Sequence, residues 1–454
     1  MKVFGSSGVR GVVGEEITPA FVGRVAKAAG STWGADAVAV ARDTRRTGGM
    51  LADAVAADLA ATGSDVRRLG VVPTPGAQAY AERTEVPVVM VTASHNPPEY
   101  NGVKLIGADG VELSRDTLER VEDRLLAERF DTAQWDGTGE RRRVDSARRE
   151  YVDGLLDAVD RDALAAADLT VALDPGHGAG ALTSPTFFRE LGCSVRTVNA
   201  QPDGHFPGRD PEPVAENLDD LGELVRATDA DIGVAHDGDA DRAIFYDETG
   251  SYIEGDATLA ALADAALDAG DTTVSAVNVS QRLVDVAERT GATLELTPIG
   301  STNIITRIRE LTAEGEHVPV AGEGNGGILF PGFRLARDGA YTAAKFLELL
   351  TDQTASEAVA DYAGYANVRE NVAYETDAER EAMLAAAEEY AAAAEATPTT
   401  IDGYRLDYGD AWVLARPSGT EPVVRVYAEA GERARAESLA SAFTSALVDA
   451  KADA

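Results

Sequence analysis

The sequence predicts an α/β fold in which a unit of buried strand, loop and helix recurs about three times, followed by a smaller α+β segment. Short apolar, β-branched runs alternate with longer alanine- and leucine-rich stretches, which indicates βαβ units. Several of these runs end in glycine-rich or charged loops, as expected where ligands bind at the carboxyl ends of strands. The length of 454 residues suits about three or four domains.

The first domain is predicted over residues 1–148. Its elements are, in order, a glycine-rich opening loop at 4–11, a helix from Thr18 with Pro19 at its first position, a strand at 38–41, a helix from Met50 and a strand at 87–91. Because Pro97 and Pro98 cannot continue a strand, residues 92–96 must form a loop at the carboxyl end of the last of these strands.

Two further α/β domains are predicted over residues 149–253 and 254–368, and a different α+β domain over 369–454. In the last domain Thr376 and Glu379 form a capping box, which opens an alanine-rich helix. The remaining expected elements are strands at 169–173, 231–235, 243–246, 273–279, 317–321, 404–406, 411–414 and 423–427, and a closing helix from Arg433.

Composition restricts the classes of partner and the compartment. Cys193 is the one cysteine, so an intramolecular disulfide is excluded and a reducing compartment is indicated. The N-terminus lacks a signal-peptide apolar region, and no apolar run approaches the roughly 18 residues of a membrane span. The formal net charge of −36 argues against nucleic acid or an anionic membrane as a partner. We therefore expect a cytoplasmic protein.

The charge pattern suggests adaptation to concentrated salt. Arginine replaces lysine almost throughout, and the lysines are Lys2, Lys27, Lys104, Lys345 and Lys451. Such a composition resembles that of proteins from salt-accumulating halophiles, where salt screens self-repulsion. On this hypothesis, refolding and activity improve from low salt to molar potassium chloride, and full stability in low salt would contradict it. A lysine kept inside a dense motif, such as Lys104, is a candidate for a chemical role.

Ser94 stands at the tip of the loop that follows the strand at 87–91. A serine at the carboxyl end of a buried strand is exposed to ligands, and here His95 supplies a titratable neighbour and Lys104 a cation. These are the requirements of a nucleophile or phosphate carrier. The competing interpretation is a Ser-His-Asn-Pro turn chosen for its backbone conformation alone.

Asp237, Asp239 and Asp241 alternate with small residues after the strand at 231–235. Three carboxylates so close together require a hard cation to neutralise them, and magnesium suits a site that leaves room for water and phosphate oxygens. A calcium-binding EF-hand loop is disfavoured because Arg242 occupies the sixth position, where that loop needs glycine. A solvated acidic turn without function is the other alternative.

Two more loops carry donors and acceptors. Residues 416–425 offer the guanidinium groups of Arg416 and Arg425, two hydroxyls and the amides of a glycine turn, which together suit a phosphate. Residues 322–327 place Glu323 and Asn325 between glycines, which suits sugar hydroxyls. A plain hairpin connection and a flexible loop are the respective alternatives.

These four loops, Thr-Ala-Ser-His-Asn-Pro, Asp-Gly-Asp-Ala-Asp-Arg, Gly-Glu-Gly-Asn-Gly-Gly and Arg-Pro-Ser-Gly-Thr-Glu-Pro, resemble in order and interval the active-site loops of the α-D-phosphohexomutases. That superfamily includes phosphomannomutase, phosphoglucomutase and phosphoglucosamine mutase. The resemblance covers nearly the whole chain. It implies three similar α/β domains with mixed sheets around a central cleft, plus the smaller C-terminal α+β domain.

The resemblance also implies roles for individual residues. Ser94 is the phosphorylated serine, with His95, Lys104 and Arg242 as catalytic partners, and Asp237, Asp239 and Asp241 bind Mg²⁺ together with the phosphoserine. The substrate-binding residues are Arg10, Gly300, Glu323, Asn325, Arg416, Ser418, Gly419, Thr420 and Arg425. Where many relatives have Ser-Gly-His in the sugar loop, this chain has Asn325-Gly326-Gly327, so a histidine is missing and the sugar preference is open.

The implied activity is the interconversion of hexose 1-phosphate and hexose 6-phosphate through a phosphoserine enzyme and a hexose 1,6-bisphosphate, which also serves as activator. Lys104 and His95 both remain candidates for the general base. Two alternative functions are an aspartate-nucleophile sugar phosphatase, suggested by the Asp-x-Asp spacing, and a non-catalytic cation- or sugar-binding protein. The choice among mannose, glucose and glucosamine and the oligomeric state stay open.

Overall fold

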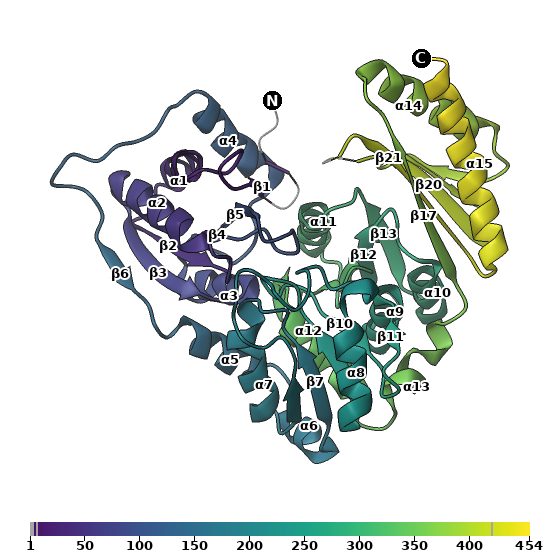
Figure 1. Cartoon of the computed structure of the whole chain (residues 1–454), viewed down its shortest axis with the longest axis horizontal. Coiled ribbons are helices and arrows are strands. Elements are labelled where there is room, and N and C mark those ends of the chain that lie inside the picture. The colour runs from purple at the N-terminus through teal and green to yellow at the C-terminus, as the bar shows by residue number, and fades with distance from the viewer. Residues whose placement is uncertain (1–3, 6–7, 419–420) are drawn as a thin grey trace. The chain divides into compact units, whose positions relative to one another are not determined.

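The structure is a computed structural model that describes residues 4–5, 8–418 and 421–454. Its elements form two compact units (Figure 1). Unit 1 consists of Met1–Thr258 and Pro319–Val359, and unit 2 consists of Leu259–Val318 and Ala360–Ala454. Within the described residues, no helix is both long enough and apolar enough to cross a membrane.

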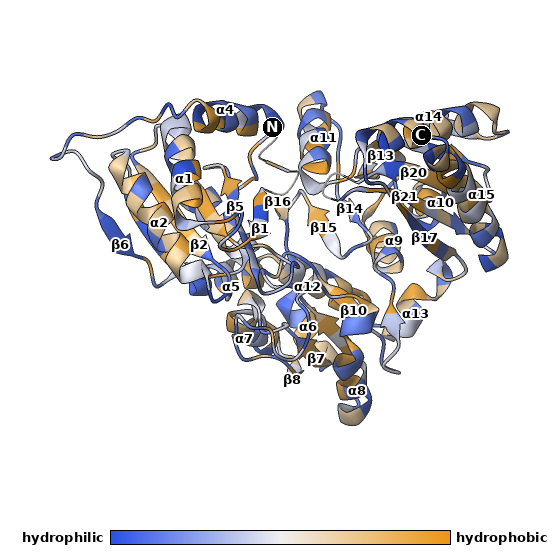
Figure 2. Cartoon of the chain, turned by 45° about the horizontal axis from the view of Figure 1, so that its top comes forward, coloured by the Kyte–Doolittle hydropathy of each residue, from blue (hydrophilic) through white to orange (hydrophobic). Residues whose placement is uncertain are grey.

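Unit 1 contains a mixed sheet with the strand order β1-β5-β4-β2-β3-β6. Strands β2, β3, β4 and β6 are parallel, whereas β5 runs antiparallel to β1 and β4. The strands are β1 (Val9–Val12), β2 (Ala37–Arg42), β3 (Asp65–Val71), β4 (Val88–Val91), β5 (Tyr100–Ile106) and β6 (Arg141–Arg143). The edge strand β6 consists of exposed arginines and is hydrophilic in Figure 2.

Helices cover both faces of this sheet because its central strands are apolar on both sides. Val38 and Val40 of β2 pack in one hydrophobic cluster with α1 and α2, whereas Ala39 and Ala41 pack in a second cluster with α3. The helices are α1 (Pro19–Trp33), α2 (Gly48–Ala61), α3 (Thr74–Thr84) and α4 (Arg115–Leu126). Thr18 caps α1 by accepting from the Phe21 amide, as the sequence predicts.

A second mixed sheet of unit 1 has the order β11-β10-β9-β7-β8, in which β7, β8 and β9 are parallel. Its strands are β7 (Thr170–Asp174), β8 (Ser194–Thr197), β9 (Ile232–Ala235), β10 (Ile244–Tyr246) and β11 (Tyr252–Ile253). The accompanying helices are α5 (Ala147–Asp157), α6 (Arg161–Ala167), α7 (Ser184–Glu190) and α8 (Asp219–Thr228), with short 3₁₀ turns η1 (Ala179–Leu182) and η2 (Ala215–Asn217).

The rest of unit 1 is an antiparallel group of strands, β14 (Ala321–Glu323), β15 (Gly327–Phe330) and β16 (Arg334–Arg337), followed by α12 (Gly339–Leu349) and α13 (Ala355–Val359). The prediction of a strand at 317–321 is therefore wrong in its limits. Pro319 has no amide hydrogen to donate to a neighbouring strand, so pairing begins only after it. The shift places Glu323 inside a strand, opposite Gly327.

Unit 2 has a parallel strand pair, β12 (Thr272–Ala276) and β13 (Thr293–Thr297), with helices α9 (Gly255–Ala266, whose first turn belongs to unit 1), α10 (Gln281–Thr290) and α11 (Ser301–Glu314). The 3₁₀ turn η3 (Ala360–Tyr362) leads into its C-terminal part, which is an antiparallel sheet of order β17-β21-β20-β19-β18. These strands are β17 (Ala366–Ala373), β18 (Thr397–Thr399), β19 (Tyr404–Asp407), β20 (Ala411–Pro417) and β21 (Val423–Ala430).

Two helices, α14 (Asp377–Ala393) and α15 (Arg433–Ala452), pack on this antiparallel sheet. Met383 of α14, Phe443 of α15 and Val413 of β20 belong to one buried cluster. The predicted capping box is present, because Thr376 accepts from the Glu379 amide and the Glu379 side chain reaches back to the Thr376 amide. The smaller α+β domain expected from the sequence is thus confirmed.

Candidate active site

Three loops of unit 1 carry most of the predicted site residues of that unit, and each loop follows a buried strand, whereas Lys104 lies in β5. A backbone hydrogen bond joins two of these loops, because the Ala243 amide of one donates to the Gly326 carbonyl of the other at 3.1 Å. The loops are the Ser94 loop (92–99, between β4 and β5), the metal loop (236–243, between β9 and β10) and the sugar loop (324–326, between β14 and β15).

Ser94 lies in the Ser94 loop with its hydroxyl directed at the metal loop. Its Oγ donates to Asp237 Oδ2 at 2.6 Å and lies 3.3 Å from His95 Nδ1. The backbone of Ser94 has a φ of 50°, a left-handed conformation that a residue with a Cβ adopts at a cost of about 1–3 kcal/mol. Such a conformation lifts the side chain off the end of β4 and presents the hydroxyl to the carboxylates.

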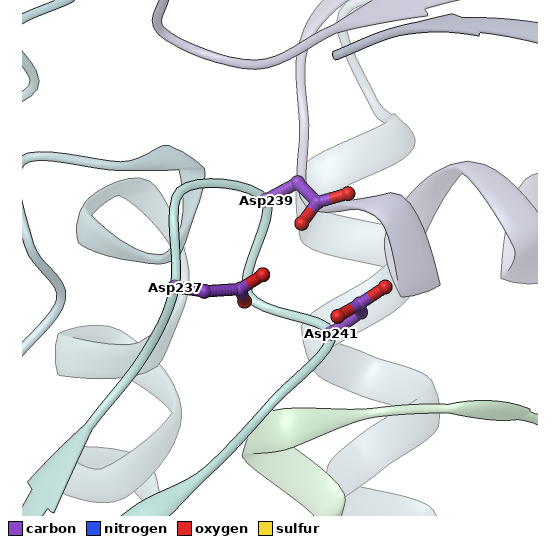
Figure 3. Close-up of side chains that lie close together, drawn as sticks. All are labelled: Asp237, Asp239 and Asp241. Atoms are coloured by element: carbon purple, nitrogen blue, oxygen red, sulfur yellow. The ribbon is translucent and has the colours of Figure 1, made fainter. Parts of the chain in front are cut away.

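The carboxylates of Asp237, Asp239 and Asp241 converge in the metal loop, and Figure 3 shows them on one turn of the chain. One ligand atom from each lies within 4.8 Å of the others, and all three residues are buried. Oδ1 of Asp239 and Oδ1 of Asp241 have no hydrogen-bond partner among the described residues. Buried carboxylate oxygens without a donor are costly unless a cation binds them, so this donor set fits a hard metal ion.

The opposite oxygens of the same carboxylates are fully engaged. Lys104 Nζ donates at 2.9 Å to Oδ2 of both Asp239 and Asp241. Thr74 Oγ1 donates to Asp239 Oδ2 at 2.5 Å, and Arg337 Nη2 donates to Asp241 Oδ2 at 2.6 Å. These bonds orient the two carboxylates so that each Oδ1 is left for a metal ion.

Lys104 is a fixed cation in this arrangement. Burial by itself would lower the pKa of Lys104, but the neighbouring charges of Asp239 and Asp241 outweigh it and raise that pKa. For Asp239, burial acts to raise the pKa, and the Lys104 ammonium group and the Thr74 hydroxyl hold it below its ordinary value. Lys104 therefore stays protonated next to the carboxylates, which suits an electrostatic role better than that of general base.

The pKa of Asp237 shifts in the opposite direction to that of Asp239. Burial, and then the charges of Asp241 and Asp239, raise the pKa of Asp237 well above its ordinary value. A carboxyl group with a raised pKa in the folded state stabilises the protein at low pH, and this contribution is lost as the pH rises through that pKa. The metal-free protein should thus lose stability on the alkaline side of that transition.

We expect Asp237→Asn to raise the melting temperature of the metal-free protein by a few degrees at pH values above the raised Asp237 pKa, because an amide cannot ionise beside the two neighbouring carboxylates. The variant should also lose less stability than wild type as the pH rises. Melting curves recorded in chelator between about pH 5 and pH 8 measure both effects. Superimposable curves for the two proteins would contradict the assignment.

His95 lies between the Ser94 hydroxyl and the cationic side chain of Arg242. Arg242 Nη2 lies 2.9 Å from His95 Nδ1, and the charge of Arg242, followed by burial, strongly lowers the pKa of His95. The imidazole is therefore neutral at physiological pH. Arg10 Nη1 donates to Asn96 Oδ1 at 3.1 Å, which ties the strand β1 to the Ser94 loop.

The two side chains predicted to bind the sugar, Glu323 at the end of β14 and Asn325 in the sugar loop, differ in exposure. Glu323 is buried, with 9% of its surface exposed, whereas Asn325 is exposed. Asn325 Oδ1 accepts from the Gly327 amide at 3.0 Å, so its NH₂ group is the part directed outward. A Cβ at position 327 would lie only 2.8 Å from Cδ of Arg337. The glycine at this position therefore leaves room for the Arg337 side chain to reach Asp241.

The predicted phosphate loop belongs to unit 2, in the hairpin between β20 and β21. Arg416 and Arg425 lie directly opposite each other in the register of the two strands, and like charges in such a pair repel. Asp402 forms an ion pair with Arg416 at 3.1 Å, and Glu421, which is more exposed, forms one with Arg425. The Ser418 hydroxyl accepts from the Glu421 amide at 3.3 Å, and Gly419 and Thr420 lie outside the described residues.

Gly300, also in unit 2, precedes α11 and has a φ of 123°, a conformation that only glycine adopts readily. Sequence reasoning missed Thr74 and Arg337, although both contact the carboxylates in unit 1. Thr74 opens α3 and Arg337 ends β16, so each stands at an element boundary, but neither belongs to a dense motif. Position at the end of a strand was the signal available for Arg337.

Comparison with protein families gives matches along most of the chain. Four family models match in order: the phosphoglucomutase/phosphomannomutase α/β/α domain I at residues 1–132, domain II at 149–250, domain III at 254–365 and the C-terminal domain at 370–446. The α/β fold class expected from the sequence, with mixed sheets and a smaller C-terminal domain, is confirmed.

Individual relatives agree with these matches. The chain is 40% identical over 445 residues to a phosphoglucomutase/phosphomannomutase of Thermococcus kodakarensis, covering 96% of each chain. It is 39% identical over 447 residues to a probable phosphoglucosamine mutase of Methanopyrus kandleri, covering 97% of each. A solved phosphoglucomutase/phosphomannomutase family protein of Burkholderia thailandensis aligns with a TM-score of 0.85 at 30% identity, covering 99% of this chain and 97% of that one. The chain therefore belongs to the phosphoglucomutase/phosphomannomutase family of intramolecular phosphotransferases.

Proposed function

We propose that this phosphomutase interconverts hexose 1-phosphate and hexose 6-phosphate by passing a phosphoryl group through Ser94. The observation that carries the proposal is the 2.6 Å hydrogen bond between Ser94 Oγ and Asp237 Oδ2, which joins a strained, buried loop serine to a carboxylate trio. The names of the relatives support glucose, mannose and glucosamine phosphates as the candidate substrates. A phosphatase or a plain binding protein would leave the serine without a role.

The proposed reaction has two matched transfers. In the first, the free hydroxyl of a hexose monophosphate attacks the phosphorus of phosphoserine, so that a phosphorus–oxygen bond to the sugar forms and the bond to Ser94 Oγ breaks. The hydroxyl proton is released to a base, and Ser94 is left as an alkoxide that takes up a proton. In the second, Ser94 attacks the other phosphate of the resulting hexose 1,6-bisphosphate, which regenerates phosphoserine and releases the isomeric monophosphate.

We propose Asp237, Asp239 and Asp241 as the ligands of Mg²⁺, which would act as a Lewis acid on the phosphoryl oxygens. The unpartnered Oδ1 atoms of Asp239 and Asp241 support this assignment. A phosphate on Ser94 Oγ, placed beside Asp237, would add an oxygen ligand to the same ion. Lys104 and Arg337 pair with the Oδ2 atoms of Asp239 and Asp241, so the two Oδ1 atoms stay available to a cation.

The remaining site residues of unit 1 would stabilise the phosphoryl group while it is transferred. Lys104, Arg242 and Arg10 supply fixed positive charge near Ser94, which would stabilise the charge spread over the equatorial oxygens of the transition state. His95, neutral and next to both Ser94 Oγ and Arg242, would hold the arginine in place and contact the phosphate.

In unit 2 we propose that Arg416, Ser418, Gly419, Thr420 and Arg425 bind the phosphate that is not transferred. The support is the opposed pair of arginines in the hairpin, whose mutual repulsion an anion would relieve. Gly300 would approach the substrate through its backbone, because its φ of 123° leaves no room for a side chain in an ordinary conformation.

Glu323→Ala should raise the Michaelis constant for the hexose phosphate by about 10- to 100-fold, since a buried carboxylate that accepts from sugar hydroxyls makes a charge-assisted hydrogen bond. The concentration of Mg²⁺ for half-maximal activity should change less than twofold. Steady-state kinetics with separate titrations of sugar and metal check this, and Glu223→Ala on the exposed face of α8 is the matched control. An unchanged Michaelis constant for each of the three hexose phosphates would remove Glu323 from the sugar site.

The experiment that tests the function directly assays the pure protein with glucose, mannose and glucosamine 1-phosphates, with and without a hexose 1,6-bisphosphate primer. We expect turnover of at least one, stimulation by the primer, and a fraction of chains heavier by one phosphoryl group. Inorganic phosphate release without isomerisation would instead favour the phosphatase alternative.

We also propose the domain limits 1–148, 149–253, 254–368 and 369–454 for this chain. The family models that match 1–132, 149–250, 254–365 and 370–446 support them. Limited proteolysis should cut close to these limits. The expected cytoplasmic location and the hypothesis of adaptation to concentrated salt stay predictions.

A further inference from the structure

Arg45, in the loop after β2, has a fully buried side chain that binds the backbone of the Ser94 loop. Nη2 donates to the carbonyls of Ser94 at 2.8 Å and Asn96 at 2.5 Å, and Nη1 donates to those of Pro97 at 2.6 Å and Tyr100 at 3.0 Å. Nε donates to the Asp43 carboxylate at 3.1 Å. Every N–H of the guanidinium group is therefore in use: three of the five donate to carbonyls of the Ser94 loop, and one donates to that of Tyr100 at the start of β5.

The Asp43 carboxylate also restrains the amide of Ser94, through the side chain of Thr92. Asp43 Oδ2 accepts from the Thr92 hydroxyl at 2.7 Å, and Thr92 Oγ1 accepts from the Ser94 amide at 2.9 Å. The amide and the carbonyl of Ser94 are thus both fixed, one through Thr92 and one through Arg45. Because the backbone of Ser94 has a φ of 50°, these bonds restrain a conformation that the residue would otherwise leave.

A similar buried Arg–Asp pair binds the backbone of the metal loop on the second sheet of unit 1. Arg209 Nε donates to the Asp174 carboxylate at 2.8 Å, and its Nη2 donates to the carbonyl of His236 at 2.6 Å, immediately before Asp237. Asp43 and Asp174 both stand at or directly after the end of a parallel strand, next to the strand that leads into a catalytic loop. The Phe206 ring lies 5.2 Å from the Arg45 guanidinium group, so the segment 205–209 touches both arrangements.

We propose that Arg45 is a positioning residue for phosphoryl transfer, which holds Ser94 in the strained conformation that directs its hydroxyl toward Asp237. This inference rests on the proposed function of Ser94 as phosphoryl carrier. Arg45 acts through the backbone of the loop and does not contact the phosphate itself. A displacement of the reacting oxygen by about 1 Å is enough to lower a transfer rate by about 100-fold.

The test is Arg45→Lys, measured by the rate at which a hexose 1,6-bisphosphate phosphorylates Ser94, followed by intact mass. Lysine keeps the charge beside Asp43, but its three donors cannot reach four carbonyls and a carboxylate. We expect the rate and kcat to fall by about 100-fold. The final phosphate per chain and the Mg²⁺ concentration for half-maximal activity should stay within about twofold of wild type. Arg46→Lys, at the exposed neighbouring position, is the control and should behave like wild type.

A merely structural role for Arg45 predicts a different result. Partial unfolding would lower the final phosphate per chain, with a normal rate for the folded fraction, and this outcome or a wild-type rate would overturn the proposal. If Arg45→Lys does not fold, the variant Thr92→Val provides the test, because it removes the hydroxyl to which the Ser94 amide donates. Thr92→Val should slow the phosphorylation of Ser94 without lowering its final extent. A wild-type protein that never takes up phosphate would instead refute the proposed function.

Discussion

Ser94→Ala should lower kcat by at least about four orders of magnitude and abolish the phosphorylated form of the protein. In the proposed cycle every turnover passes through the Ser94 Oγ–phosphorus bond, and no other hydroxyl occupies its position 2.6 Å from Asp237 among the described residues. The loss should appear in kcat, whereas binding of the hexose phosphate should be nearly unchanged. A coupled assay for isomerisation and intact-mass measurement after incubation with bisphosphate provide the two readouts.

Ser146→Ala is a suitable control for this variant, because Ser146 is exposed and its side chain makes no capping bond to α5. It should retain full activity and the added phosphate. If Ser94→Ala keeps most of its activity, the aspartate-nucleophile alternative gains support, since an Asp-x-Asp phosphatase would not need the serine.

Asp239→Asn should lower turnover by at least about 1,000-fold, which corresponds to the loss of several kcal/mol of metal-assisted stabilisation. Asp239 Oδ2 accepts from Thr74 and Lys104, and Oδ1 has no donor. An asparagine amide must place its NH₂ group at one of these positions. In one orientation it faces two donors, and in the other it replaces the oxygen that would bind the metal.

The variant can be separated from a folding defect by comparing it with chelator-treated wild type. Both proteins should be folded, as circular dichroism and melting curves would show, and both should be inactive. Added Mg²⁺ should restore wild type only, and calorimetric titration should show that the variant binds Mg²⁺ at least about tenfold more weakly. Normal turnover of wild type in excess chelator would remove the metal assignment altogether.

The sequence was sufficient to predict the catalytic loops because each is local. The run at 87–91 indicates a strand, and Pro97 and Pro98 end it, so Ser94 must lie where α/β sheets bind ligands. The alternation of Asp237, Asp239 and Asp241 likewise needs no information from elsewhere in the chain. The proximity of Asp237 to Ser94, 143 residues away, was not predictable from spacing, and only the family resemblance implied it.

The contacts that orient these groups could not be predicted, since they join residues that are distant in sequence. Thr74 lies 165 residues from Asp239, and Arg337 lies 96 residues from Asp241. Arg45 stands in a basic loop that the sequence shows plainly, but a guanidinium group that binds carbonyls looks the same in sequence as one that awaits a phosphate. The burial of Arg45 distinguishes the two cases.

By itself, then, the sequence determined the α/β units, the loops at their strand ends and the kinds of chemical group that those loops carry, because hydrophobic period and turn residues act over short ranges. Only the tertiary structure decided which oxygen of Asp239 and of Asp241 accepts hydrogen bonds and which has no donor among the described residues, and which arginines bind the backbone. Those outcomes depend on packing between segments that the chain brings together from far apart, and hydrogen-bond partners are chosen there by distance and burial.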